Sequence, residues 1–244
     1  MEGFIEKAAQ AMARKFADRC PQTVLIGPLD PSAPHRYYRT LASNLRGRAL
    51  QVFPKIQPLP PEEQDPAVET LFCLVGKEGL FCGMQSPAAA NGFYPGGTKF
   101  ISQGTADTIS RAGAKIAEAL HYLRLWLPEL PAASHWLEIG ASPGGMTSEL
   151  LARGHRVTAV DRAPLDRRLL GRPGLTAVVA DAAEFAPPAG VRYDALLSDL
   201  NGDARESLRL VIRLSRFLKP GGLVVFTMKT PGSETVPAII DLFH

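Results

Sequence analysis

Short apolar runs alternate with helical stretches through the second half of the chain. The runs with the length of buried strands are 136–139, 157–160, 175–180, 193–197 and 222–228. The stretches with apolar residues at helical spacing are 110–127, 146–153, 204–218 and 234–243. Strands that alternate with helices are typical of a doubly wound, mainly parallel sheet. We therefore predict an α/β domain of Rossmann-like type over residues 109–244.

The first 85 residues have a different pattern, which predicts a small α+β domain at 1–85. Its expected helices are 3–19 and 37–45, and its first expected strands are 23–26 and 50–53. Two further apolar runs, 70–75 and 80–84, flank Gly76-Lys77-Glu78-Gly79 and indicate a hairpin. Residues 86–108 show little pattern, and we interpret them as a linker between the two domains.

A glycine-rich turn, Gly140-Ala141-Ser142-Pro143-Gly144-Gly145, joins the first strand of the second domain to the following helix. Glycine lets the backbone approach a ligand without a Cβ in the way. The next strand ends in Asp161, 21 residues after Gly140, where an acid can hold a pair of ribose hydroxyls. The unit predicts a site for an adenosine-type ligand. The alternative is a turn whose glycines serve packing only.

Two residues of this turn distinguish between possible ligands. Ser142 stands where a dinucleotide turn has its middle glycine, and Glu138 lies two residues before Gly140. A carboxylate at that place would repel a pyrophosphate, whereas it suits the cationic sulfonium and amino groups of S-adenosylmethionine. The turn therefore favours S-adenosylmethionine as the cofactor.

Charged residues follow the later strands as well. Because ligands of parallel sheets bind beyond the carboxyl ends of the strands, Gly140, Asp161, Asp181, Asp199 and Lys229 should share one edge. There Asp181 could accept from an adenine amino group, with the adjacent Ala182 supplying a backbone N–H; the alternative for Asp181 is a helix N-cap.

We expect Asp199 and Lys229 to end neighbouring strands, so that their side chains meet and each shifts the pKa of the other. The alternative is an ion pair with a structural role only. Lys115, on the preceding helix, stays ambiguous from spacing alone, because most lysines on helices are solvated.

The composition is that of an ordinary globular protein, and it does not identify a binding partner. The chain is 45% hydrophobic and 21% charged, and its formal net charge of +3 permits a nucleic-acid partner without arguing for one. An arginine cluster in the first domain could contact phosphates, or could be an ordinary solvated face: Arg36, Arg39, Arg46 and Arg48. The three cysteines are scattered, which argues against a metal site and a disulfide framework. With no run of 18 apolar residues, we expect a cytoplasmic protein without a membrane span.

Four parts of the sequence occur together: Ser110-Arg111-Ala112-x-x-Lys115, the turn at 140–145, Ser198-Asp199 and Lys229. In these parts the chain resembles a known family, the FtsJ-like ribose 2′-O-methyltransferases. It implies a class I methyltransferase domain with S-adenosylmethionine as cofactor and with Lys115, Asp199 and Lys229 as catalytic residues. The cofactor-binding residues that we assign are Glu138, Gly140, Ser142, Pro143, Gly144, Gly145, Asp161, Asp181, Ala182 and Asp199.

Within that family the chain is similar to the RlmM type, which methylates a cytidine ribose of large-subunit ribosomal RNA. That type implies an RNA-binding THUMP domain before the catalytic one, and residues 1–85 are similar to it in layout. It also implies a fourth catalytic residue, a glutamate on a late strand. Glu234 is too close to Lys229 for that role, and the printed sequence reaches His244 first, so we expect the last strands of the domain to be missing.

Three other functions stay open on the sequence. A methyltransferase acting on a small molecule or a protein would share the cofactor site but would not need Lys115, Asp199 and Lys229 together. A non-catalytic RNA-binding relative gains weight from the unassigned fourth residue. A nicotinamide dehydrogenase is disfavoured by Glu138 and by the turn at Ser142-Pro143.

Overall fold

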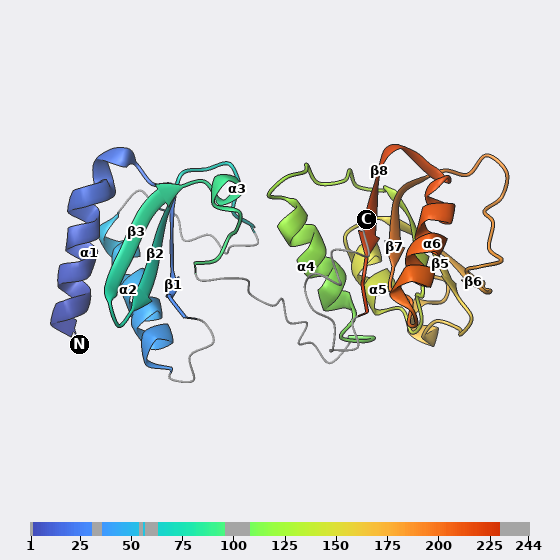
Figure 1. Ribbon diagram of the computed structural model, residues 1–244, viewed down its shortest axis with the longest axis horizontal. Helices are drawn as coiled ribbons and strands as arrows, with labels where there is room; N and C mark the ends of the chain where they lie inside the picture. The colour runs from blue at the N-terminus through green and yellow to red at the C-terminus, as the bar shows by residue number, and fades with distance from the viewer. Residues whose placement is uncertain (1, 31–35, 54–55, 57–62, 96–107, 230–244) are drawn as a thin grey trace. The chain divides into compact units, whose positions relative to one another are not determined.

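The computed structural model describes residues 2–30, 36–53, 56, 63–95 and 108–229. The chain forms two compact units (Figure 1). The first contains Met1–Phe100 and His121–Pro128, and the second contains Ile101–Leu120 and Glu129–His244. The domain boundaries expected at 85 and 108 remain a prediction about which parts of the chain fold independently.

The first unit has two long helices that pack against a three-stranded sheet. Its elements are α1 (Glu2–Phe16), a short 3-10 turn (Ala17–Arg19), β1 (Thr23–Pro28), α2 (Tyr37–Val52), β2 (Thr70–Gly76), β3 (Gly79–Gln85) and α3 (Pro87–Ala90). The strand order is β1-β2-β3, with β1 parallel and β3 antiparallel to β2. The predicted hairpin is confirmed. Apolar residues of α1, α2 and the sheet share one core, which includes Met12, Leu45 and Leu71.

The strand expected at 50–53 is wrong, because α2 continues through this stretch to Val52. Leu41, Leu45, Ala49 and Phe53 recur every four residues, and all four are buried. This spacing puts them on one face of a helix, against the core. The burial of that face therefore prevails over the strand-like composition of the short run.

The stretch interpreted as a linker contains ordered structure in its described part. Ser86 caps α3, since its side chain accepts a hydrogen bond from the Ala89 N–H at 3.2 Å. Phe93 is fully buried, and its ring lies 4.5 Å from that of His121, centroid to centroid. Residues 86–95 therefore pack as part of the first unit.

The arginine cluster of the first unit divides into two pairs. Arg48 forms an ion pair with Glu6 of α1, and Arg46 donates to the carbonyl oxygen of Val24. These two contacts connect α2 to its neighbours, so they have a structural role. Arg36 and Arg39, at the start of α2, are exposed.

The second unit contains a five-stranded sheet in which every pair of neighbours is parallel. Its elements are α4 (Gly113–Leu123), β4 (His135–Ile139), α5 (Gly145–Ala152), β5 (Arg156–Asp161), a 3-10 turn (Arg167–Leu169), β6 (Leu175–Val179), β7 (Tyr193–Ser198), α6 (Ala204–Ser215) and β8 (Leu218–Phe226). The strand order is β6-β5-β4-β7-β8. The predicted doubly wound, mainly parallel sheet is thus confirmed. The helix expected at 234–243 lies outside the described residues.

Apolar side chains cover both faces of this sheet. On one face Ile116 of α4 and Leu150 of α5 pack with Trp136. On the other face Val211 and Leu214 of α6 pack with Leu137 and its neighbours. The central strands β4 and β7 are consequently buried on both sides, which explains why neighbouring positions such as Trp136 and Leu137 are both apolar.

Helix α4 is shorter than the expected 110–127. At its start the side-chain oxygen of Ser110 accepts from the Ala112 N–H, so a turn precedes the helix. At its end, the N–H groups of Leu125 and Trp126 donate to residues three positions earlier, which tightens the last turn.

The described residues contain neither a candidate membrane span nor a candidate metal site. None of their helices is long and apolar enough to cross a membrane. The same residues contain no cluster of three or more histidine, cysteine, aspartate or glutamate side chains able to hold a metal ion.

Gly47 offers a test of the helical assignment of α2. It lies inside the helix, and a Cβ added there would have no heavy atom within 4 Å. Alanine loses less conformational freedom than glycine on folding, so Gly47→Ala should raise the free energy of unfolding by about 0.5–1 kcal/mol. Urea unfolding of both proteins measures the difference. A destabilised Gly47→Ala protein would contradict the continuous helix.

Candidate functional site

The four charged residues expected at the sheet edge lie at or just after the ends of four strands that all run in the same direction. Asp161 ends β5, and Asp199 comes directly after β7. Asp181 and Lys229 follow β6 and β8 within three residues. Because the strands are parallel, their carboxyl ends form one edge of the second unit.

The glycine turn passes very close to the end of β7. Gly140 has a φ of +76°, and a Cβ there would lie 2.9 Å from both the Asp199 carbonyl carbon and the Leu200 backbone nitrogen. Only glycine meets both constraints without strain. Gly144, with a φ of +108°, is the N-cap of α5, and Gly145 is the first residue of that helix. The turn thus brings the start of α5 and the end of β7 to the same edge.

The carboxylate of Asp161 connects the glycine turn to the end of β5. One oxygen accepts from the Ser142 N–H at 2.9 Å, and the other accepts from the Ala163 N–H at 2.8 Å. The Ser142 hydroxyl donates to the Pro164 carbonyl oxygen, and the Pro143 carbonyl oxygen accepts from the Asp166 N–H. Each carboxylate oxygen of Asp161 keeps a further lone pair, which can accept from a ligand hydroxyl.

Asp181 makes the capping contact that was one of its two expected roles, and its role toward an adenine amino group stays a prediction. One carboxylate oxygen accepts from the Ala183 N–H at 2.8 Å, as in a capped turn, and the other accepts from Arg162. The backbone hydrogen bond from Ala183, followed by the bond from Arg162, lowers the pKa of Asp181 below its usual value. The neighbouring Ala182 is buried, and its carbonyl oxygen accepts from Arg213 at 2.9 Å. Asp181 is therefore held ionised and oriented at the edge.

Glu138 lies beneath the turn, away from solvent. Its side chain is 1% exposed and accepts a hydrogen bond from the Thr147 hydroxyl at 2.7 Å. Burial raises the pKa of Glu138 to about 8, the Thr147 hydroxyl opposes this rise, and the charges of Asp199 and Asp161 add to it. The carboxyl group therefore connects the end of β4 to α5, the helix that follows the glycine turn.

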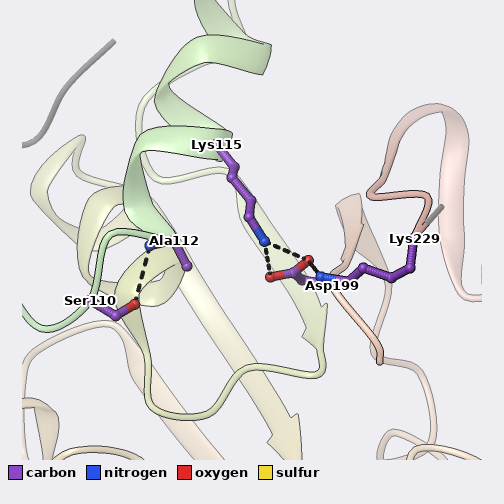
Figure 2. Close-up of polar contacts among 5 residues, drawn as sticks. All are labelled: Ser110, Ala112, Lys115, Asp199 and Lys229. Atoms are coloured by element: carbon purple, nitrogen blue, oxygen red, sulfur yellow. Dashed lines mark hydrogen bonds and ion pairs between the residues drawn. The ribbon is translucent and has the colours of Figure 1, made fainter. Parts of the chain in front are cut away.

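Lys115, Asp199 and Lys229 meet in one cluster (Figure 2). The Lys229 Nζ is 2.6 Å from Asp199 Oδ1, so the contact predicted between these two residues is present. The Lys115 Nζ, which the sequence left ambiguous, lies 3.1 Å and 2.9 Å from the two oxygens of the same carboxylate. The Asp199 side chain is only 13% exposed, whereas those of Lys115 and Lys229 are 47% and 30% exposed. The cluster therefore presents two ammonium groups toward solvent around one enclosed carboxylate.

Two further residues that support this edge were not singled out from the sequence: Thr147 and Arg162. Thr147 supports Glu138, and Arg162 connects the end of β5 to Asp181. Their roles depend on contacts across 9 and 19 positions of the chain, respectively. In the sequence, the feature that could have identified them was their position beside motif residues, since Thr147 follows the glycine turn and Arg162 follows Asp161.

The raised pKa of Glu138 predicts a pH-dependent stability. Its carboxyl pKa is about 8 when folded, against 4.5 as the ordinary value, so between these limits the folded chain holds a proton that the unfolded chain releases. The contribution of Glu138 is complete below pH 4.5 and is lost as the pH rises toward 8. Glu138→Gln should therefore gain stability relative to the wild type as the pH rises from 5 to 8, by about a few kcal/mol.

Urea unfolding of both proteins at several pH values measures this difference. Groups common to both proteins, including His135 and His155 with their lowered pKa values, cancel in the comparison. Parallel stability curves for the two proteins would show that Glu138 is ionised in the folded state.

Comparison with known proteins identifies the family to which this chain belongs. A curated relative, ribosomal RNA large subunit methyltransferase M of Saccharophagus degradans, is 28% identical over 64% of this chain and 46% of its own length. The protein of the same name from Halorhodospira halophila is 34% identical over 54% of this chain and 39% of its own length. The chain thus spans less than half the length of these relatives.

A solved structure with S-adenosylmethionine bound, an amino pentose methyltransferase from Micromonospora echinaspora, matches at 21% identity and a TM-score of 0.36. The match covers 51% of this chain and 52% of that one, a likeness too distant to carry an argument. Residues 109–237 match the family described as the methyltransferase domain. Since this match covers more than half of the 244 residues, the chain belongs to the methyltransferase domain family.

Proposed function

We propose that this chain uses S-adenosylmethionine to methylate the 2′-hydroxyl of a ribose in ribosomal RNA. The observation that carries the proposal is the carboxylate of Asp199, shared by Lys115 and Lys229 beside the glycine turn. Family membership supports the methyl transfer, and the name of the relatives supports ribosomal RNA as the substrate.

The residues at the edge fit the proposed cofactor. Asp161 would accept from the ribose hydroxyls through its remaining lone pairs, and Asp181 would accept from the adenine amino group. The Gly140 turn, which has no room for a Cβ, packs directly against the end of β7, so a cofactor bound at the turn would lie next to Asp199. When bound, the cofactor supplies an electrophilic methyl group on a positively charged sulfur. Glu138 would support the turn through Thr147.

The lysine–aspartate cluster would prepare the hydroxyl that accepts the methyl group. In the reaction the ribose oxygen forms a bond to the methyl carbon, the sulfur–carbon bond breaks, and the hydroxyl proton leaves. Lys229, after releasing one of its own protons to solvent, would take the hydroxyl proton, and the ammonium group so restored would again be paired with Asp199 through their 2.6 Å contact. Alignment of the hydroxyl oxygen with the methyl group would contribute much of the rate.

Lys115 would hold the ribose from the other side. A 2′-hydroxyl lies next to a phosphodiester, so a fixed ammonium group can bind either the hydroxyl oxygen or the phosphate. Lys115 is anchored to Asp199 but 47% exposed, which leaves hydrogen-bonding capacity for a ligand. A hydroxyl flanked by a negative charge therefore matches the two lysines better than an uncharged small molecule does.

For the first unit we propose a THUMP-like RNA-binding role, with residues 1–85 as the binding domain, 86–108 as the connection and 109–244 as the catalytic domain. The support is the sequence resemblance together with the exposed Arg36 and Arg39 at the start of α2. We also propose that the protein acts in the cytoplasm, where its ribosomal RNA substrate would be available.

Lys229→Ala tests the proposed catalytic role. The wild type should transfer tritiated methyl groups to an unmodified large-subunit ribosomal RNA transcript, and the modified bond should resist alkaline hydrolysis because its 2′-hydroxyl is blocked. Lys229→Ala should lower the transfer rate at least about 100-fold and leave cofactor affinity unchanged. Lys219→Ala is a matched control, because Lys219 forms a 2.6 Å ion pair with Asp194 on the same two strands. Transfer that survives in Lys229→Ala would remove Lys229 from the mechanism, and transfer to protein only would refute RNA as the substrate.

Asp161→Ala tests the cofactor site separately. Loss of charge-assisted hydrogen bonds to the ribose should weaken S-adenosylmethionine binding about 10- to 100-fold. Isothermal titration calorimetry measures the affinity, and thermal unfolding without cofactor shows whether the variant is folded. Unchanged affinity in a folded Asp161→Ala protein would exclude Asp161 from the site.

A further inference from the structure

Gly145 has no conformational reason to be glycine. It is the first residue of α5, and its φ lies outside the left-handed region. A Cβ at this position would overlap the Ser110 side-chain oxygen, and it would lie 3.0 Å from the Ser110 carbonyl oxygen and 3.1 Å from the Gly113 nitrogen. Residue 145 is therefore free of a side chain because the segment 110–113 passes directly over it.

The segment 110–113 is itself held in a defined turn. The Ser110 side-chain oxygen accepts from the Ala112 N–H at 3.3 Å, and the Ser110 carbonyl oxygen accepts from the Gly113 N–H. Helix α4 begins at Gly113, and Lys115 lies in its first turn (Figure 2). The place where the segment contacts Gly145 thus determines where the backbone of Lys115 starts.

Lys115 depends on this placement more than a buried side chain would. Its side chain is 47% exposed, so packing restrains it weakly, and its contacts with Asp199 span 84 positions of the chain. A long, flexible side chain reaches a fixed carboxylate only if its own backbone is held at the right distance. The next residue, Ile116, is 1% exposed and packs in the core of the same unit, which supplies a second point of attachment.

We infer that Ser110 and Gly145 form a contact that sets the position of Lys115 relative to the glycine turn, and that Ser110 is a positioning residue for methyl transfer. The inference rests on the proposed function and deepens it. Ser110 acts through Lys115, because its hydroxyl is engaged with the Ala112 N–H and packs on Gly145. The contact connects the part of the site that holds the cofactor to the part that holds the ribose.

Two explanations of the glycine at position 145 make different predictions: the contact with Ser110, and space needed by a ligand. If residue 145 is glycine because Ser110 lies above it, the damage caused by Gly145→Ala should depend on Ser110. If it is glycine because a ligand needs the space, removal of the Ser110 side chain should give no relief. A double-mutant cycle separates these two cases.

The cycle compares the wild type, Gly145→Ala, Ser110→Gly and the double variant in the full chain. Ser110→Gly should slow single-turnover methyl transfer to the ribosomal RNA transcript about tenfold, with cofactor affinity changed by less than about twofold. Gly145→Ala should be slower still. The double variant should recover several-fold relative to Gly145→Ala, because the overlapping oxygen is gone. Additive effects, or a loss of cofactor affinity in Ser110→Gly as large as its loss of rate, would overturn the inference.

Ser86→Gly is a matched control for the loss of a capping serine. The Ser86 side chain accepts from the Ala89 N–H at 3.2 Å in the first unit. Its replacement should lower stability by about as much as Ser110→Gly, with no slowing of methyl transfer. Equal slowing in both variants would show that Ser110 acts only through general stability.

A measurement that needs no activity distinguishes failure of this inference from failure of the proposed function. Lysines labelled by reductive ¹³C-methylation give an NMR signal for Lys115, which Lys115→Arg identifies by its absence. In the wild type this signal should differ from that of solvated lysines, and Ser110→Gly should move it toward theirs. An unmoved signal would overturn the inference even in an active enzyme. If the wild type methylates no RNA but Ser110→Gly still moves the Lys115 signal toward that of solvated lysines, only the proposed function is refuted.

Discussion

A single carboxylate shared by two ammonium groups is the interaction on which the edge of the second unit depends. Asp199 is mostly enclosed, and an enclosed charge without partners would cost several kcal/mol in desolvation. Lys115 and Lys229 supply these partners from two different elements. The cost of leaving Asp199 unpaired therefore holds the first turn of α4 and the residues after β8 close to the end of β7.

The sheet makes this arrangement possible because its two central strands are rigid. β4 and β7 are covered by apolar side chains on both faces, so their ends are fixed against one another. Gly140, pressed against the Asp199 backbone, brings the turn next to the carboxylate without a side chain between them. The same packing that stabilises the fold thus sets the distance between the turn and the lysine–aspartate cluster.

The carboxyl groups around the turn differ in how they carry their charge. Asp161 and Asp181 accept backbone hydrogen bonds, and Asp181 also accepts from Arg162, so both lie at the edge as ordered acceptors. Glu138, beneath them, is buried near two negative charges, and because its hydrogen bonds with Thr147 do not offset the burial, its pKa rises to about 8. The site thus keeps two oriented carboxylates at its edge and a carboxyl group beneath them that is protonated near neutral pH.

The sequence by itself determined the parallel sheet, the glycine turn and the meeting of Asp199 with Lys229. These follow from local patterns and from the rule that parallel strands end at one edge. It did not determine the length of α2, where burial of one helical face prevailed over a strand-like run. Only the tertiary structure brought Lys115 to Asp199 and turned Glu138 toward Thr147. Such contacts depend on side-chain direction and on the docking of distant helices, and a spacing along the chain carries neither.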